Sequence, residues 1–231
     1  MNVAPVICAL ISLPAAWFGG VLIDRVPGNE PLRPLPGVRL RGWHLFLYLS
    51  MLATFTLMGV RFEGQPPLLI AGYLLVTGML LTVSVIDIRC YRLPDRIVLP
   101  TLVASVALVV VESLRAGEPA RIEYALAGGG LYFGFLLIVH LISPRGMGFG
   151  DVKLAAVMGL YVGWMADDYT TSVALVLWAM LVGFVVGSFV GIGLLAARRR
   201  NAAIPFGPFL AFGTITVVLL APHLISTPLS I

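Results

Sequence analysis

The chain contains 231 residues, 59% of them hydrophobic and only 11% charged, and its mean hydropathy is +1.00. These values exclude a soluble globular enzyme or binding domain, because such proteins carry far more polar residues. The formal net charge of +4 does not indicate a nucleic-acid partner, since the basic residues are distributed as in membrane proteins. We expect an all-α polytopic membrane protein whose basic loops contact anionic lipid head groups.

Apolar segments long enough to cross a hydrocarbon core of about 30 Å recur along the whole chain. Backbone groups in lipid must be satisfied within each segment, and no period-2 alternation suggests a barrel, so we expect helices. The sixth segment is short and the fourth begins among prolines, so the count is seven or eight. The candidates span residues 3–23, 44–60, 67–86, 97–111, 124–143, 152–166, 171–197 and 206–226.

Basic residues concentrate in alternate loops, which hold twelve of the 15 lysines and arginines. The positive-inside rule places these loops in the cytoplasm and both chain ends outside. The first apolar segment lacks a basic start, so a retained helix is expected rather than a cleaved signal. The twelve residues are Arg25, Arg33, Arg39, Arg41, Arg89, Arg92, Arg96, Arg145, Lys153, Arg198, Arg199 and Arg200.

A single domain is expected over residues 1–231, because the longest polar stretch, 24–43, is too short to bury a core of its own. This stretch is expected to be a cytoplasmic loop, and residues 87–96 and 144–151 are expected to be cytoplasmic active-site segments. No repeat of broken helices supports a transporter built on inverted repeats.

Two further patterns concern packing and covalent structure. Gly183, Gly187 and Gly191 recur every four residues, which favours a close approach by another helix. Cys8 and Cys90 form neither a disulfide framework nor a metal-binding motif.

Asp87, Asp95 and Asp151 adjoin apolar segments on the cytoplasmic side, and ionisable groups at such positions are expensive and often functional. Asp87 ends the third segment and Asp151 opens the sixth, so the topology places both at the same face and at similar depth. Two neighbouring carboxyl groups share one proton, so one can activate a water while the other protonates a peptide carbonyl. This arrangement suits an aspartic protease.

No other catalytic set competes with the aspartates. His44, His140 and His223 are isolated in the sequence, and there is no Cys–His pair or HExxH motif. His140 lies within an apolar segment and is expected to be a hydrogen-bonded packing residue.

Glycines precede Asp151 directly, at Gly146, Gly148 and Gly150. Glycine permits backbone conformations closed to other residues and lets an extended peptide approach the backbone closely. A turn or packing role is the alternative interpretation of these glycines.

Three segments together resemble the type IV prepilin leader peptidases, which are related by motif to the GxGD intramembrane aspartic proteases. The segments are 86–100, 146–154 with Gly163-Trp164, and 204–213. The resemblance covers about residues 70–213 and implies that Asp87 and Asp151 are the catalytic pair. It implies substrate-binding or supporting roles for Gly146, Gly148, Gly150, Lys153, Asp95, Pro205, Gly207 and Pro208. The prolines at 205 and 208 either shape a substrate groove or simply open a helix.

The N-terminal part resembles the family only in outline, at Phe18–Pro27. The paired CxxC motifs of bifunctional members are absent, so the chain resembles a short form without the cysteine-rich loop. No metal is expected, zinc included, N-methyltransferase activity is doubtful, and S-adenosylmethionine would be needed only if methylation is retained.

The resemblance implies an aspartic endopeptidase in the bacterial cytoplasmic (inner) membrane. It would cleave the basic leader from type IV prepilin or pseudopilin precursors at the cytoplasmic face, with lipid as its surroundings and no nucleic-acid partner. Alternatives are another GxGD protease with different substrates, a small proton- or cation-coupled transporter, and a catalytically inactive assembly protein.

Overall fold

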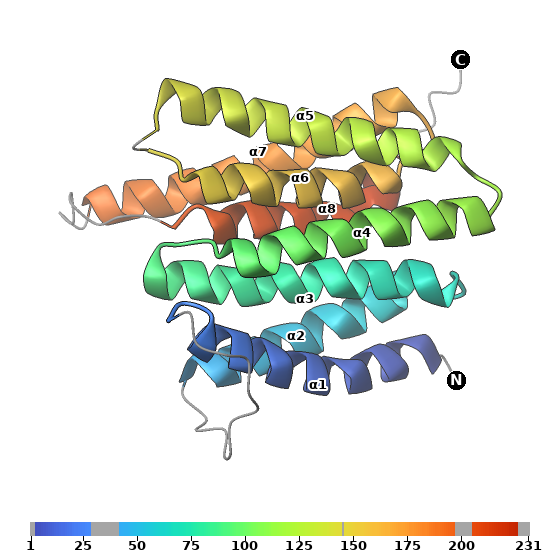
Figure 1. The fold of residues 1–231 in the computed structure, drawn as a ribbon, viewed down its shortest axis with the longest axis horizontal. Helices are drawn as coiled ribbons and strands as arrows, with labels where there is room; N and C mark the ends of the chain where they lie inside the picture. Colours follow the sequence, from blue (N-terminus) through green and yellow to red (C-terminus); the bar gives the residue numbers. More distant parts are fainter. Residues whose placement is uncertain (1–2, 29–41, 145, 197–204, 226–231) are drawn as a thin grey trace.

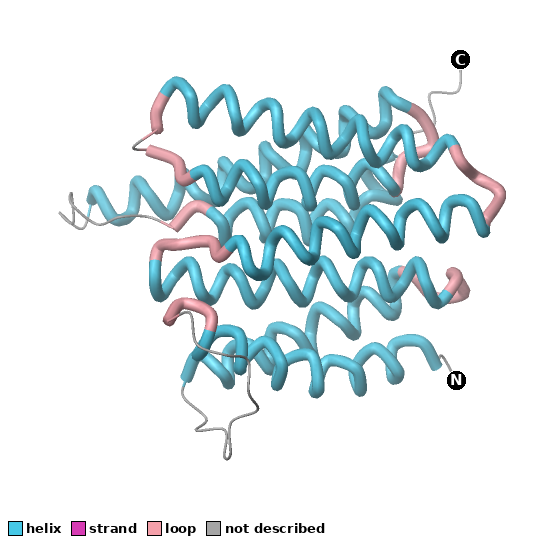
Figure 2. The backbone as a smooth tube through the Cα atoms, in the orientation of Figure 1, coloured by secondary structure: helices cyan, strands magenta, loops and turns pink. Residues whose placement is uncertain are grey.

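The computed structural model describes residues 3–28, 42–144, 146–196 and 205–225. Within these ranges the chain forms eight α-helices and no β-strand. The helices run side by side along the long axis of the molecule, and short turns join most of them (Figures 1 and 2). They are α1 Val3–Arg25, α2 Gly42–Arg61, α3 Pro67–Cys90, α4 Asp95–Arg115, α5 Ala120–Ile142, α6 Phe149–Trp164, α7 Tyr169–Ala196 and α8 Gly207–Ile225.

The protein is a polytopic membrane protein, as its composition predicts. Six of the described helices, α1 to α5 and α7, are long and apolar enough to cross a membrane, and α8 contains a shorter apolar stretch. Each helix overlaps one predicted segment, and the boundaries differ by a few residues. The loop predicted at 24–43 lies mostly outside the described residues, which resume at Gly42.

The short sixth helix lies at the centre of the molecule. With 16 residues, α6 is about 24 Å long, less than the hydrocarbon core. It contacts α3, α4, α5, α7 and α8, and beyond its first turn nearly every residue is buried. Such a helix is shielded from lipid by its neighbours, so its position is set by packing against protein.

Glycines bring α5 and α6 into close contact. A Cβ atom added to Gly128 would lie 2.6 Å from the Gly159 carbonyl oxygen and 2.9 Å from the Gly163 Cα. Gly159 and Gly163 in turn face the backbone of Gly128 and Tyr124. Small residues at such positions let two helix backbones approach closely, as they do in other membrane proteins.

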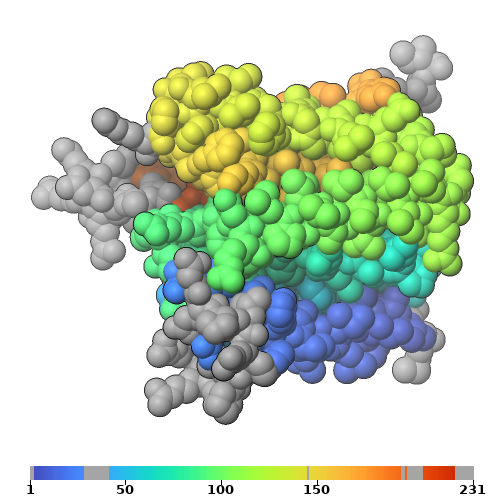
Figure 3. Space-filling model, viewed as in Figure 1, coloured from blue at the N-terminus to red at the C-terminus, as the bar shows by residue number. Residues whose placement is uncertain are grey.

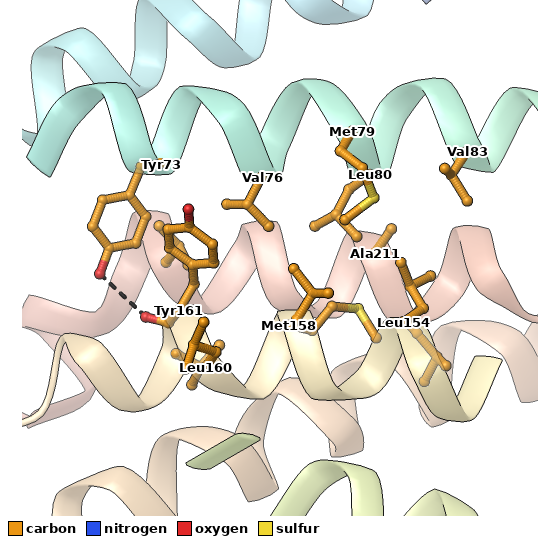
Figure 4. Packing of buried hydrophobic residues seen from close by; sticks show 14 of the residues in the cluster. Tyr73, Val76, Met79, Leu80, Val83, Leu154, Met158, Leu160, Tyr161 and Ala211 are labelled. Atoms are coloured by element: carbon orange, nitrogen blue, oxygen red, sulfur yellow. Dashed lines mark hydrogen bonds between the residues drawn. The ribbon is translucent and has the colours of Figure 1, made fainter. Parts of the chain in front are cut away.

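Helix α3 covers another side of α6 and also contacts α8 (Figure 4). Val76, Leu80 and Val83 of α3 belong to the same buried apolar cluster as Met158 of α6 and Ala211 of α8. Near the C-terminal end of α6, the Tyr73 hydroxyl donates a hydrogen bond of 3.1 Å to the Tyr161 carbonyl. The α3–α6–α8 interface is therefore fixed along much of its length.

The predicted packing role of the glycines in α7 is confirmed where the structure describes their contacts. A Cβ atom on Gly183 would lie 3.0 Å from the Phe209 carbonyl oxygen, and one on Gly187 would lie 3.3 Å from the Phe209 ring. Helix α8 thus packs closely on α7 as well as on α3, which fixes the position of its first residue, Gly207.

Candidate active site

The first carboxyl group lies on the last turn of α3. The predicted apolar segment ends at Ile86, but the helix continues to Cys90, and Tyr91 caps it with a left-handed backbone (φ 51°). Most of the predicted active-site segment 87–96 is consequently helical, and the connection to α4 comprises only residues 91–94. Asp87 is 6% exposed.

The second carboxyl group lies on the first turn of α6. Gly148 caps this helix in an extended conformation, and its carbonyl accepts a hydrogen bond of 3.1 Å from the Asp151 backbone N–H. Phe149 and Gly150 are already helical, so the predicted active-site segment 144–151 includes the first residues of α6. The Asp151 side chain is buried, and its Oδ1 has no hydrogen-bond partner among the described residues.

The two carboxyl groups meet at Gly207, the first residue of α8. The Gly207 backbone N–H donates a hydrogen bond of 3.2 Å to Asp87 Oδ2. A Cβ atom on Gly207 would lie 2.9 Å from Asp87 Oδ2 and 3.5 Å from Asp151 Oδ1. These two oxygens are therefore no farther apart than the sum of the two distances, which is close enough for both to contact one small group.

A cavity of about 400 Å³ opens beside the carboxyl pair. Its wall is half polar, and it includes all three glycines that precede Asp151 as well as the residues just before α8. The lining residues are Asp87, Tyr91, Arg92, Leu93, Gly146, Gly148, Gly150, Asp151, Pro205 and Phe206.

A larger apolar groove of about 590 Å³ lies elsewhere, against α1, α3 and the start of α4. In Figure 3, α3 (teal) is visible between α1 (blue) and α4 (green) on this side of the molecule. The α3 residues along it, such as Leu74, Gly78 and Thr82, lie on a different face of the helix from Asp87. It contains no carboxyl group, so we place the candidate active site in the smaller cavity.

The expectation that the glycines supply unusual backbone conformations is wrong. Among the described residues only Tyr91, Gly64 and Gly117 have a positive φ, and Gly148 has φ −71°. Space explains Gly150, where an added Cβ would lie 2.7 Å from the Leu93 Cβ. The packing alternative therefore holds for Gly150, since the link between α3 and α4 rests against it.

Gly146 and Gly148 differ in how much room surrounds them. A Cβ atom on Gly146 would lie 2.7 Å from the Ser143 hydroxyl, whereas one on Gly148 would meet nothing closer than the Asp151 Oδ2 at 3.6 Å. Open space beside Gly148, at the wall of the cavity, leaves room for a bound chain.

Asp95 and Lys153 form an ion pair outside the cavity wall. The Lys153 Nζ donates to both carboxylate oxygens of Asp95, at 2.7 and 2.8 Å. Asp95 is the first residue of α4, and its side chain is 54% exposed. The pair joins the start of α4 to the first turn of α6, which fits a supporting position better than a chemical one.

The three residues predicted around the start of α8 have different surroundings. Pro205 lines the cavity, Gly207 donates its backbone N–H to Asp87 and leaves space beside both carboxyl groups, and Pro208 lies in the first turn of the helix. The segment opens a helix, and that opening lies against the carboxyl pair. Its role in a substrate groove stays a prediction.

The contacts of two histidines were not foreseen from the sequence. His44 is not isolated, because its Nε2 lies 3.1 Å from Asp24 Oδ2, and Arg89 reaches the other oxygen of Asp24 at 3.5 Å. His140 Nδ1 lies 2.8 Å from the Met147 carbonyl oxygen, as expected for a hydrogen-bonded residue, but its partner in the loop before α6 was not foreseen. The side chain of His223 lies outside the described residues.

The described helices form an apolar bundle with two buried carboxyl groups at one end. The chain belongs to the type IV leader peptidase family, whose sequence model matches residues 74–192. Both Asp87 and Asp151 lie within the matched range.

Similar curated proteins are named prepilin leader peptidase/N-methyltransferase. The Aeromonas hydrophila protein is 36% identical over 144 residues, 60% of this chain and 45% of its own length. The Escherichia coli protein is 33% identical over 152 residues, 64% of this chain and 62% of its own length. The chain thus spans about half the length of most of these curated relatives. No solved structure gives a significant match.

Proposed function

We propose that the protein is an aspartic endopeptidase that removes the basic leader from type IV prepilin or pseudopilin precursors. The observation that carries the proposal is the placement of Asp87 and Asp151 against Gly207, beside a half-polar cavity. Family membership and the printed names of the relatives support the choice of substrate. The proposed reaction needs no metal or other cofactor.

The carboxyl pair would catalyse addition of water to a peptide bond. One carboxylate takes a proton from water as its oxygen attacks the carbonyl carbon, while the other carboxyl group donates its proton to the carbonyl oxygen. The tetrahedral intermediate then collapses, the C–N bond breaks, and the leaving amine takes up a proton. The products are a leader with a new carboxylate and a shortened protein with a new amino terminus.

We place the active site at the cytoplasmic side of the bacterial inner membrane. Arg25, Arg89, Arg92, Arg96 and Lys153 lie in or beside the helix ends at the same end of the bundle as the carboxyl pair. The opposite loops combine three arginines with six acidic residues. This asymmetry follows the positive-inside rule and would keep a basic leader at the cytoplasmic surface.

Cleavage of a precursor by the purified protein in lipid vesicles tests the proposal. Asp87→Asn and Asp151→Asn should each lower the cleavage rate by about 10²–10⁴-fold, because each removes one half of the acid–base pair. Asp167→Asn is the matched control and should keep full activity, because this side chain is 85% exposed and lies at the opposite end of the bundle. Unchanged cleavage in either of the first two variants would contradict the assignment of the pair.

Product analysis separates the proposal from its alternatives. Mass spectrometry of the new termini should locate cleavage before the hydrophobic helix of the precursor, whereas another GxGD protease would cut within a membrane helix. Proton or cation flux without peptide cleavage would instead support a transporter.

Methylation is tested in the same reaction. Labelled S-adenosylmethionine should leave the new amino terminus unmodified, since the two cysteines of this chain do not provide the CxxC pairs of the bifunctional members.

A further inference from the structure

The loop before α6 is held by a histidine on α5. His140 lies in the last turn of α5, and its Nδ1 is 2.8 Å from the Met147 carbonyl oxygen. A carbonyl oxygen only accepts, so the His140 Nδ1–H must be the donor. The bond fixes the peptide group that links Met147 to Gly148, and Gly148 caps the helix that carries Asp151.

The same histidine also contacts the first residue of α6. The rings of His140 and Phe149 are 5.5 Å apart between centroids, and the Lys153 ammonium lies 5.1 Å from the centroid of Phe149. Lys153 is in turn held by Asp95 of α4. The first turn of α6 is thus fixed from the α5 side by His140 and from the α4 side by the ion pair.

Local backbone bonds carry this restraint to the carboxyl group. The N–H groups of Gly146 and Met147 both donate to the Ser143 carbonyl, at 3.0 and 3.3 Å, and the Asp151 N–H donates to the Gly148 carbonyl. Between the Ser143 bonds and the Asp151 bond, the His140 contact ties the loop to α5. Loss of its donor would free the Met147–Gly148 peptide and let the Asp151 turn shift.

We propose that His140 is a positioning residue that donates from Nδ1 to the Met147 carbonyl and thereby fixes Asp151 for reaction with Asp87. The proposal rests on the proposed peptidase function. It assigns His140 no contact with substrate, so its effect should fall on the rate of the chemical step and not on substrate binding.

Three substitutions separate the hydrogen bond from the bulk of the ring. His140→Asn places an amide N–H close to the position of Nδ1 and should preserve the bond. His140→Gln places its amide one atom farther out, and His140→Leu has no donor. For precursor cleavage in vesicles, His140→Leu and His140→Gln should lower kcat about tenfold with KM unchanged, since small misplacements of reacting groups are costly. His140→Asn should stay within about twofold of the wild type, on the same reasoning.

Two kinetic results would overturn the proposal. One is a wild-type kcat for His140→Leu, and the other is a fall in kcat for His140→Asn as large as that for His140→Leu.

Backbone amide exchange tests the positioning without any substrate. Deuterium uptake over residues 146–152 should be faster in His140→Leu than in the wild type, and unchanged in His140→Asn. Uptake in α7 serves as the control for overall folding and should be equal in all variants. Equal uptake over 146–152 in His140→Leu and the wild type would refute the restraint, even if the protein proved to have a different activity. Conversely, absence of cleavage with the expected exchange pattern would refute the proposed function alone.

Discussion

Gly207 is the residue at which the two carboxyl groups meet, and its lack of a side chain is a requirement of the site. Gly207→Ala would place a methyl group 2.9 Å from Asp87 Oδ2, which is closer than a carbon and an oxygen atom can pack. Either the carboxyl group or the start of α8 must shift. We expect cleavage to fall about tenfold or more, because catalysis depends on alignment of the reacting groups.

The measurement for Gly207→Ala is the initial rate of precursor cleavage in vesicles. Gly134→Ala on α5 is a suitable control, since an added Cβ there has no atom within 4 Å. Equal rates for both variants and the wild type would show that the space at Gly207 is not needed.

The sequence predicts which residues form the site, but it does not predict the contacts between them. The order of the apolar segments and the charge pattern of the loops predict that Asp87 and Asp151 share one face of the membrane, because topology alone decides that. The bond from Gly207 to Asp87, the contact of Gly150 with Leu93 and the bond from His140 to the loop depend on packing between distant segments. The conformational preferences of single residues do not predict such contacts. The glycines before Asp151 suggested unusual backbone conformations, whereas the structure shows that Gly150 is needed because no side chain fits there.

At the level of elements, the pairing of α5 with α6 determines where Asp151 lies. Gly159→Ala would press a methyl group into the backbone of Gly128, and overpacked interiors usually lose about 1–3 kcal/mol. We therefore expect the variant to unfold at a lower temperature than the wild type. The unfolding temperature is measured in detergent by circular dichroism or a thermal-shift assay.

Gly130→Ala provides the matched control for Gly159→Ala. It lies on α5 but has open space around its added Cβ, so it should leave the unfolding temperature unchanged or raise it slightly, as alanine favours helix. Destabilisation by Gly130→Ala equal to that by Gly159→Ala would mean that the close contact is not the cause.

Helix extents were well predicted because the hydrocarbon thickness sets a minimum length for most of them. The predicted helix boundaries are wrong mainly at the membrane surface, where the hydrocarbon thickness no longer sets the length of a helix. Helix α3 continues beyond Ile86 through the polar residue Asp87, and α4 begins at Asp95 despite Pro100 within it. Apolar length identifies the part of a helix in lipid, but capping and tertiary contacts at the membrane surface decide where the helix stops.

At the level of the whole molecule, the two natural cysteines offer a test of orientation without engineering. Cys90 ends α3 at the end of the bundle that carries the carboxyl pair and is partly exposed, whereas Cys8 is buried in α1. A membrane-impermeant maleimide should label Cys90 in inverted membrane vesicles and not in intact cells.

Cys90→Ser should abolish this labelling, which would confirm the site of modification. Labelling of Cys90 from outside intact cells would contradict the proposed orientation and place the carboxyl pair on the wrong side for a cytoplasmic leader.

The central position of α6 has a consequence for how the protein responds to its membrane. A helix in contact with lipid tilts or shifts when the bilayer becomes thinner or thicker, but α6 is enclosed by five other helices. The depth of Asp151 is therefore set by the glycine contacts with α5 and by the bond from the loop to His140. The distance between Asp151 and Asp87 becomes a property of the folded chain, and the outer helices can adapt to membranes of different thickness without changing it.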